Sequence, residues 1–263
     1  MSLEEKQADQ PRSAANPFCF SRPSARIPLW VKLAYTGFVC VLVPYYLYAY
    51  GPTNFLYFCD VALLMTLVAV WTEDALWAAM PAVGILVPQA LWMVDFIGSL
   101  LGLRVVGMTA YMFDAGIPLF ARGLSLFHFW LPLFLLWLVK RLGYDRRAFV
   151  AWTAVAWVLM LVCYFVMPLP PRENLPANVD RLRQVTLFGL KLPADSVNLP
   201  VNINYVYGLS DDKLQQWMPP LEYLGLLMVG LPICVFLPTH LILRGIFREP
   251  VTSSRSASIK ELS

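Results

Sequence analysis

The sequence predicts an all-α, polytopic membrane protein with six transmembrane helices and both termini in the cytoplasm. Of its 263 residues, 59% are hydrophobic and only 14% are charged, whereas soluble domains carry roughly a quarter charged residues. The apolar residues form runs close to the roughly 20 residues that a membrane-spanning helix needs, and basic residues gather at alternate ends of these runs. This composition excludes a disordered chain, a coiled coil and an ordinary soluble domain.

Polar segments lie at both ends of the chain. Residues 1–26 carry charges and prolines throughout, without the apolar core of a secretory signal, and we expect a cytoplasmic tail. Residues 249–263 form a second polar tail. Between them, residues 27–248 form one membrane domain, with apolar runs at 29–50, 54–71, 75–101, 118–139, 148–167 and 220–243.

The basic residues predict the orientation. Four of them lie in the link 140–147, whereas the link 51–54 has none. Further basic residues flank the first and last runs: Arg22, Arg26, Lys32, Arg244 and Arg248. The positive-inside rule places all these ends in the cytoplasm. The net charge of +3 is too small to indicate a nucleic-acid partner, and the five cysteines lack the spacing of a zinc site or disulfide framework.

Two longer segments are expected on the non-cytoplasmic side. Residues 102–117 hold Arg104 and Asp114 among apolar residues and are predicted to lie at the membrane interface. Residues 168–219 form a long loop in which recurring prolines disfavour long helices. Its residues 201–207 alternate apolar and amide side chains, which predicts a short strand. We expect this loop to be an ordered cap.

Three ionisable residues within the spans are the main functional candidates, because a charged side chain is costly in the bilayer. Asp60, Asp95 and His128 are all predicted in the outer half of the membrane, with Asp60 roughly 9 Å below Asn54. Glu222 begins the last span on the same side. His240 lies near the cytoplasmic end, where an interfacial histidine is expected.

Neighbours at helical spacing extend these candidates into a predicted site. On the second span, one face holds Thr53, Tyr57 and Asp60, with Asn54 and Cys59 alongside. On the third span, Gln89, Trp92 and Asp95 share a face. On the fourth span, Ser125 lies next to His128, with Arg122 at the mouth of the predicted pocket. In this hypothesis His128 is the general base and Asp60 or Asp95 orients it. Water, Ser125 or Cys59 is the nucleophile.

The remaining polar residues would contact substrate. Asn54 or Gln89 would supply oxyanion or headgroup contacts, and Tyr57, Trp92, Arg122 and Glu222 would line the pocket. With a single deep imidazole, no metal site is predicted, and no motif indicates a cofactor. The predicted function is hydrolysis or acyl transfer on a membrane lipid or amphipathic ester.

Three other interpretations stay open. The polar residues could form one satisfied network between helices, since such hydrogen bonds stabilise membrane helix packing by about 0.6 kcal/mol each. They could relay protons in a coupled transporter. The protein could also be an assembly partner that binds other proteins through its tails and outer loop.

Several runs of sequence resemble a bacterial family commonly labelled only "membrane-associated protein". These runs are 52–60, 109–114, 122–132, 141–147, 216–220 and 237–240. The resemblance covers nearly all of the chain after the first tail and implies a multi-pass protein of the bacterial inner membrane. It implies no particular activity.

A fainter resemblance concerns the six-helix androgen-induced (FAR-17a) family and the YwaF-like membrane proteins. Residues 55–60 are similar to a Phe-Leu-Thr-Phe-x-Asp pattern of the androgen-induced family, and His128 precedes Leu131-Pro132 much as that family's catalytic histidine does. That family includes lipid-ester hydrolases that use a threonine and a histidine. This chain departs from the pattern at Tyr57, which replaces the threonine, and in a histidine-to-proline spacing that is one residue shorter.

Overall fold

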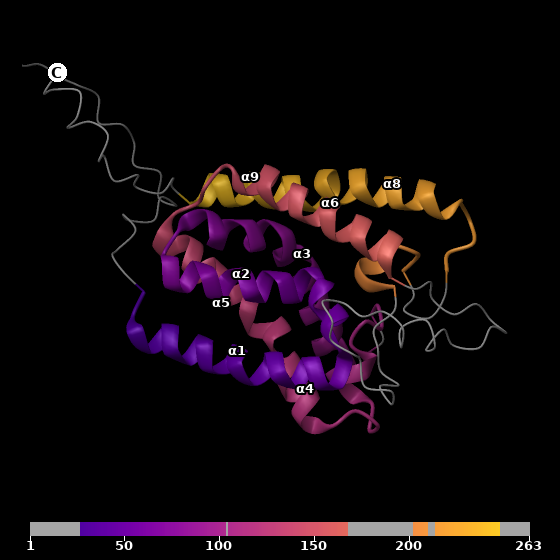
Figure 1. Ribbon diagram of the computed structural model, residues 1–263, viewed down its shortest axis with the longest axis horizontal. Helices are drawn as coiled ribbons and strands as arrows, with labels where there is room; N and C mark the ends of the chain where they lie inside the picture. The colour runs from indigo at the N-terminus through magenta and orange to yellow at the C-terminus, as the bar shows by residue number, and fades with distance from the viewer. Residues whose placement is uncertain (1–26, 104, 168–201, 210–213, 248–263) are drawn as a thin grey trace, which may run out of the picture.

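The computed structural model describes residues 27–103, 105–167, 202–209 and 214–247, and these residues form an all-helical bundle (Figure 1). Five helical stretches are long and apolar enough to cross a membrane: Leu29–Tyr50, Ala75–Leu100, Leu119–Leu142, Ala148–Val166 and Pro220–Ile246. By helix length and hydropathy, the protein is therefore an integral, multi-pass membrane protein. Both polar tails and most of the 168–219 loop lie outside the described residues.

The second predicted span is shorter than expected. Helix α2 covers Phe58–Thr72, and its 15 residues rise about 22 Å, less than the roughly 30 Å hydrocarbon core. The preceding residues form a separate 3₁₀ helix, η1 (Pro52–Leu56), because Gly51 has a positive φ of 75° and Pro52 starts a new helical turn. Tyr57 is extended between the two. The prediction that Thr53, Tyr57 and Asp60 share one helix face is therefore wrong.

The other elements follow the predicted order, with breaks inside two of the spans. They are α1 (Leu29–Tyr50), α3 (Ala75–Leu100), η2 (Ala110–Phe113), α4 (Leu119–Ser125), α5 (Phe127–Leu142), α6 (Ala148–Val166), η3 (Ile203–Tyr205), α8 (Pro220–Leu231), η4 (Pro232–Phe236) and α9 (Leu237–Ile246). Helices α4 and α5 form one span, as do α8, the π-helical η4 and α9. Helix α3 packs against α2, α5 and α6, and α1 and α8–α9 flank the bundle on opposite sides (Figure 1).

The proline that begins the π-helical turn leaves one carbonyl of α8 without its usual donor. Pro232 has no N–H, so it cannot donate to the carbonyl of Met228 four residues earlier. The indole Nε1 of Trp157 on α6 donates to that carbonyl instead, at 2.7 Å. The proline thus frees an acceptor that joins α8 to α6.

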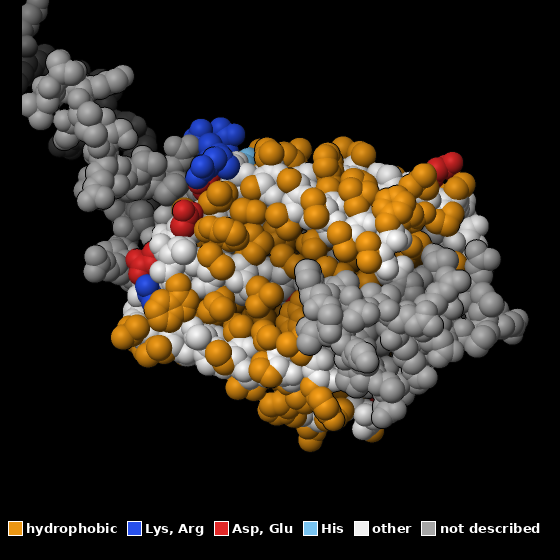
Figure 2. Space-filling model, in the orientation of Figure 1, with side chains coloured by type: hydrophobic (Ala, Val, Ile, Leu, Met, Phe, Trp, Pro, Cys, Tyr) orange, Lys and Arg blue, Asp and Glu red, His pale blue; other side chains and the backbone are white. Residues whose placement is uncertain are grey.

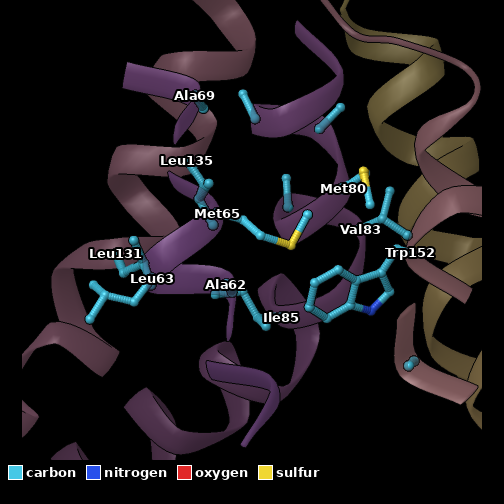
Figure 3. Packing of buried hydrophobic residues seen from close by; sticks show 14 of the residues in the cluster. Ala62, Leu63, Met65, Ala69, Met80, Val83, Ile85, Leu131, Leu135 and Trp152 are labelled. Carbon is cyan, nitrogen blue, oxygen red and sulfur yellow. The ribbon is translucent and has the colours of Figure 1, made fainter. Parts of the chain in front are cut away.

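Small residues bring the central helices close together. Ala62 and Ala69 on α2 and Ala78, Ala79 and Ala82 on α3 have no exposed surface. Figure 3 shows Met65, Met80, Val83 and Trp152 filling the space beside them. Close backbone approach through small residues is typical of membrane helices, because lipid offers no hydrophobic driving force for their association.

The two ends of the bundle differ in charge. Figure 2 shows the blue side chains, and most of the red ones, gathered at one end, which we call the charged end. It holds the start of α1, the α2–α3 and α5–α6 links and the end of α9. There Lys32 Nζ pairs with Glu73 at 2.7 Å, and Arg147 pairs with Asp145 at 2.7 Å. Hydrogen bonds from Arg147 hold the pKa of Asp145 below its usual value.

His240 also lies near the charged end, as predicted from the sequence. Its ring is buried between Tyr144 and Phe149, and Nδ1 lies 2.6 Å from the Tyr144 hydroxyl. This contact joins α9 to the α5–α6 link. The second imidazole is thus at the far end of the bundle from His128.

At the opposite end, which we call the loop end, residues 202–209 form a compact turn rather than the predicted strand. Asn202, Asn204 and Tyr205 have φ values of 51–58°, a left-handed conformation that Asn tolerates better than most residues. Asn204 Oδ1 accepts from Phe58 N at 2.9 Å, and its Nδ2 donates to Leu56 O at 2.8 Å. One buried amide therefore completes the backbone hydrogen bonds at the start of α2.

We expect Asn204→Ala to lower the free energy of unfolding by about 3 kcal/mol, because it leaves a buried N–H and carbonyl without partners and forces alanine into the left-handed region. Asn204→Gly loses the same hydrogen bonds but tolerates the φ value, so it should cost about 1 kcal/mol less. Unfolding of the purified protein in mixed micelles measures both. Equal costs for Ala and Gly would show that the backbone conformation contributes nothing.

Candidate functional site

The predicted site residues converge in part. We use the name polar cluster for Asn54, Asp60, Gln89, Trp92, Ser125 and His128, with Tyr46 and Tyr111 added by the structure. They come from α1, η1, α2, α3, η2, α4 and α5, and all lie toward the loop end.

Asp60 lies in the first turn of α2 and is 3% exposed. The chain folds back between η1 and α2, so Asn54 Nδ2 donates to Asp60 Oδ2 at 3.3 Å. The predicted depth of about 9 Å assumed a continuous helix, which the extended Tyr57 interrupts. The Cys59 thiol lies 3.8 Å from the same oxygen. The other carboxylate oxygen, Oδ1, is buried and has no partner among the described residues.

His128 lies in the first turn of α5, just after the break at Leu126. Its Nδ1 lies 2.8 Å from the backbone carbonyl of Ser125. Because a carbonyl can only accept, Nδ1 carries the proton of the neutral ring and Nε2 presents its lone pair. The ring stacks on Trp92, with centroids 5.2 Å apart. These two contacts fix the plane of the imidazole.

The prediction that a carboxylate orients His128 does not hold in the observed geometry. No hydrogen bond joins the ring to Asp60 or Asp95 among the described residues, and the Ser125 carbonyl has that role. The Ser125 hydroxyl is instead hydrogen-bonded to the Tyr46 hydroxyl, with the two oxygens 3.1 Å apart. A preassembled serine–histidine–carboxylate triad is therefore not present in these residues.

Tyr111, on η2, borders the cluster beside Ser125. Burial is the main cause that raises the pKa of its hydroxyl, and a hydrogen bond with the Ser125 side chain acts in the opposite direction. Its phenol is thus a neutral hydrogen-bonding group in contact range of three helices. Neither Tyr111 nor Tyr46 was predicted as a site residue, because a tyrosine near a span end usually belongs to the interfacial belt.

Unpartnered polar atoms set this region apart. Of the seven buried side-chain atoms without hydrogen-bond partners in the described chain, five lie in or beside the cluster. They are Thr53 Oγ1, Asp60 Oδ1, Gln89 Oε1, Trp92 Nε1 and Arg122 Nε. Buried polar atoms in native structures are nearly always hydrogen-bonded. A fully satisfied network of helix-joining residues is therefore a poor description of the cluster, whereas bound water or a polar ligand would complete it.

The carboxylate of Asp95 binds the 106–109 segment and makes no described contact with His128. Its Oδ1 accepts from the amides of Val106 and Gly107 at 2.7 and 2.8 Å, and Oδ2 accepts from the amide and hydroxyl of Thr109 at 2.8 and 2.7 Å. The carboxylate has no exposed surface. These hydrogen bonds anchor residues 106–109 to α3.

The other predicted residues are dispersed. Arg122 Nη1 donates to Met112 O at 3.1 Å, which ties α4 to η2 beside the cluster. Tyr57 lies half-buried between η1 and α2. Glu222 is exposed at the start of α8, and Figure 1 places α8 on the side of the bundle opposite α4. The prediction that Glu222 lines the same pocket is therefore wrong.

Among the described residues, no three His, Cys, Asp or Glu side chains are grouped so that they could hold a metal ion. Comparisons with protein-family models, with curated proteins and with solved structures gave no match. The polar cluster of a multi-pass membrane protein is thus the basis for assigning its chemistry.

Proposed function

We propose that the protein binds an amphipathic lipid ester with its headgroup in the polar cluster and cleaves that ester, by hydrolysis or acyl transfer, with His128 as general base. The observation that carries the proposal is the pairing of an oriented imidazole, whose Nε2 is free to accept a proton, with five unpartnered buried polar atoms.

The unpartnered atoms favour a particular kind of headgroup. Trp92 Nε1 and Arg122 Nε are donors, Asp60 Oδ1 and Gln89 Oε1 are acceptors, and the Thr53 hydroxyl is both. A headgroup that complements them must itself donate and accept hydrogen bonds, as polyol and amino-alcohol groups do. The fainter family resemblance to lipid-ester hydrolases agrees with this choice.

The chemical step needs few groups. His128 Nε2 takes a proton from water, and the water oxygen bonds to the ester carbonyl carbon. The bond from that carbon to the alcohol oxygen then breaks, and Nε2 returns the proton to the departing alkoxide. A free acid and an alcohol leave the site. Water is the better candidate nucleophile, because the Ser125 hydroxyl is engaged with Tyr46 and the Cys59 thiol faces a carboxylate.

The basic excess at the charged end supports the proposed orientation. Six basic residues lie there in the described chain (Lys32, Lys140, Arg141, Arg146, Arg147 and Arg244), against three acidic ones (Glu73, Asp74 and Asp145). The positive-inside rule would put this end in the cytoplasm. The polar cluster would then face the outer leaflet of a bacterial inner membrane.

Proton-coupled transport is a weaker candidate. A relay across the membrane requires ionisable or hydrated groups along the path. Between the polar cluster and the charged end, the described core is formed mainly by aliphatic side chains. Thr66 is buried in that region, but its hydroxyl donates to Ala62 O on its own helix.

Lipid mass spectrometry on membranes that contain wild type or variants at matched levels tests the proposal. His128→Asn keeps an amide that can donate to Ser125 O but removes the base, so we expect at least about a hundredfold less turnover with an unchanged fold. His128→Ala should lose both the hydrogen bond to Ser125 O and the base. Ser125→Ala should retain activity if water is the nucleophile. A lipid profile unaffected by His128→Asn would exclude the general-base role.

A further inference from the structure

A second candidate binding site lies on the outside of the bundle, away from the polar cluster. A groove of about 550 Å³ runs between α1 and α5 and is lined mainly by aromatic side chains. Trp130, Phe134 and Trp137 line it along α5, and Arg141 closes it at the charged end. The groove follows roughly 16 Å of α5, so it is long and narrow.

The floor of the groove is preorganised. Tyr35 stacks on Phe134 with centroids 5.3 Å apart, and Phe38 meets Trp130 edge-on at 5.0 Å. The Tyr35 hydroxyl donates to Leu63 O at 2.9 Å, so this tyrosine uses its polar atom inside the bundle and turns an apolar ring toward the groove. Rings that are already fixed lose little entropy when a flexible chain binds against them.

One end of the groove is cationic. The Arg141 guanidinium lies 5.2 Å from the centroid of the Trp137 ring, which is itself part of the groove wall. A guanidinium group recognises phosphate oxygens through paired N–H donors. Four further basic residues lie at the same end in the α5–α6 link and α9 (Lys140, Arg146, Arg147 and Arg244).

We propose that this groove binds one anionic phospholipid, with an acyl chain along the aromatic floor and the phosphate at Arg141. The charge at the groove mouth selects the anionic headgroup, and the apolar walls accept the chain. This site is independent of the proposed ester cleavage, because none of the groove's lining residues belongs to the polar cluster and Arg141 lies at the charged end. The bound phospholipid would belong to the membrane leaflet at the charged end.

Native mass spectrometry of the delipidated full-length protein tests the site, with phosphatidylglycerol and phosphatidylethanolamine as probes. We expect one phosphatidylglycerol to bind about fivefold more tightly than phosphatidylethanolamine, and Arg141→Gln to remove this preference. Ala34→Trp places a bulky ring in the groove and should weaken both lipids. Val41→Trp, two turns further along α1 and outside the groove, is the matched control and should change neither.

Two results would overturn the proposal. One is equal retention of phosphatidylglycerol by wild type, Arg141→Gln and Ala34→Trp, each checked for folding by thermal unfolding. The other is a dimer in the wild-type spectra that Ala34→Trp dissociates and Val41→Trp does not, which would assign the groove to a second copy of the chain.

Discussion

Replacing Gly84 with alanine is expected to be the most destabilising single methyl addition in the core. A Cβ at this position would lie 1.8 Å from Cε2 and 2.1 Å from Nε1 of Trp152. Trp152 has no exposed surface, so it has no space into which to move. Overpacking usually lowers the free energy of unfolding by about 1–3 kcal/mol. We expect the loss in Gly84→Ala to lie at or above the upper limit of this range, as measured by unfolding in mixed micelles.

The control is Gly37→Ala on α1, where a Cβ would meet no atom within 4 Å. Alanine is the better helix former, so this variant should be neutral or slightly stabilising. Gly84→Ala combined with Trp152→Phe should recover part of the loss, because the smaller ring leaves room for the methyl group. If Gly84→Ala were as stable as wild type, α3 and α6 could not pack as closely as described.

The second large effect is expected at Asp95. Asp95→Ala leaves three amides and a hydroxyl of the 106–109 segment without their acceptor. We expect a loss of about 4 kcal/mol, because each orphaned buried donor costs about 1–3 kcal/mol and water will satisfy some of them. Asp95→Asn keeps one acceptor oxygen and should cost about half as much.

Hydrogen exchange locates this effect. The amides of Val106, Gly107 and Thr109 should exchange faster in Asp95→Asn than in wild type, while those of the central helices should change little. Asp114→Asn is the matched control, since Asp114 is exposed and an amide oxygen can still accept from Gly116 N. Unchanged exchange at residues 106–109 would contradict the anchoring role and return Asp95 to the list of functional candidates.

The sequence was informative about the spans because a continuous apolar run has few alternatives to a buried or membrane-crossing helix. It was less informative where the backbone turns. The predicted apolar run 54–71 continues across Tyr57, where the structure separates η1 from α2, so hydropathy gave no sign of this break. The alternation in 201–207 resembles a strand, but left-handed Asn202 and Asn204 make it a turn.

The site was predictable only in part. Polar residue types at similar depth correctly placed Ser125, His128, Trp92 and Asp60 at one end of the bundle. The partners of Asp95 are backbone amides, which are present at every residue and leave no trace in the sequence. Tyr46 and Tyr111 were missed because their function depends on what they face, and side-chain directions on helices that are apolar all round cannot be fixed from periodicity.

The central claim is that His128 cleaves a lipid ester bound in the polar cluster. The most direct test is purified protein in vesicles of bacterial lipid extract, followed over time by mass spectrometry, with wild type and His128→Asn in parallel. Our account predicts that one ester lipid declines with wild type, that its acid or acyl-transfer product rises in equal amount, and that His128→Asn leaves both unchanged. Identical lipid composition with both proteins, each folded, would contradict the claim.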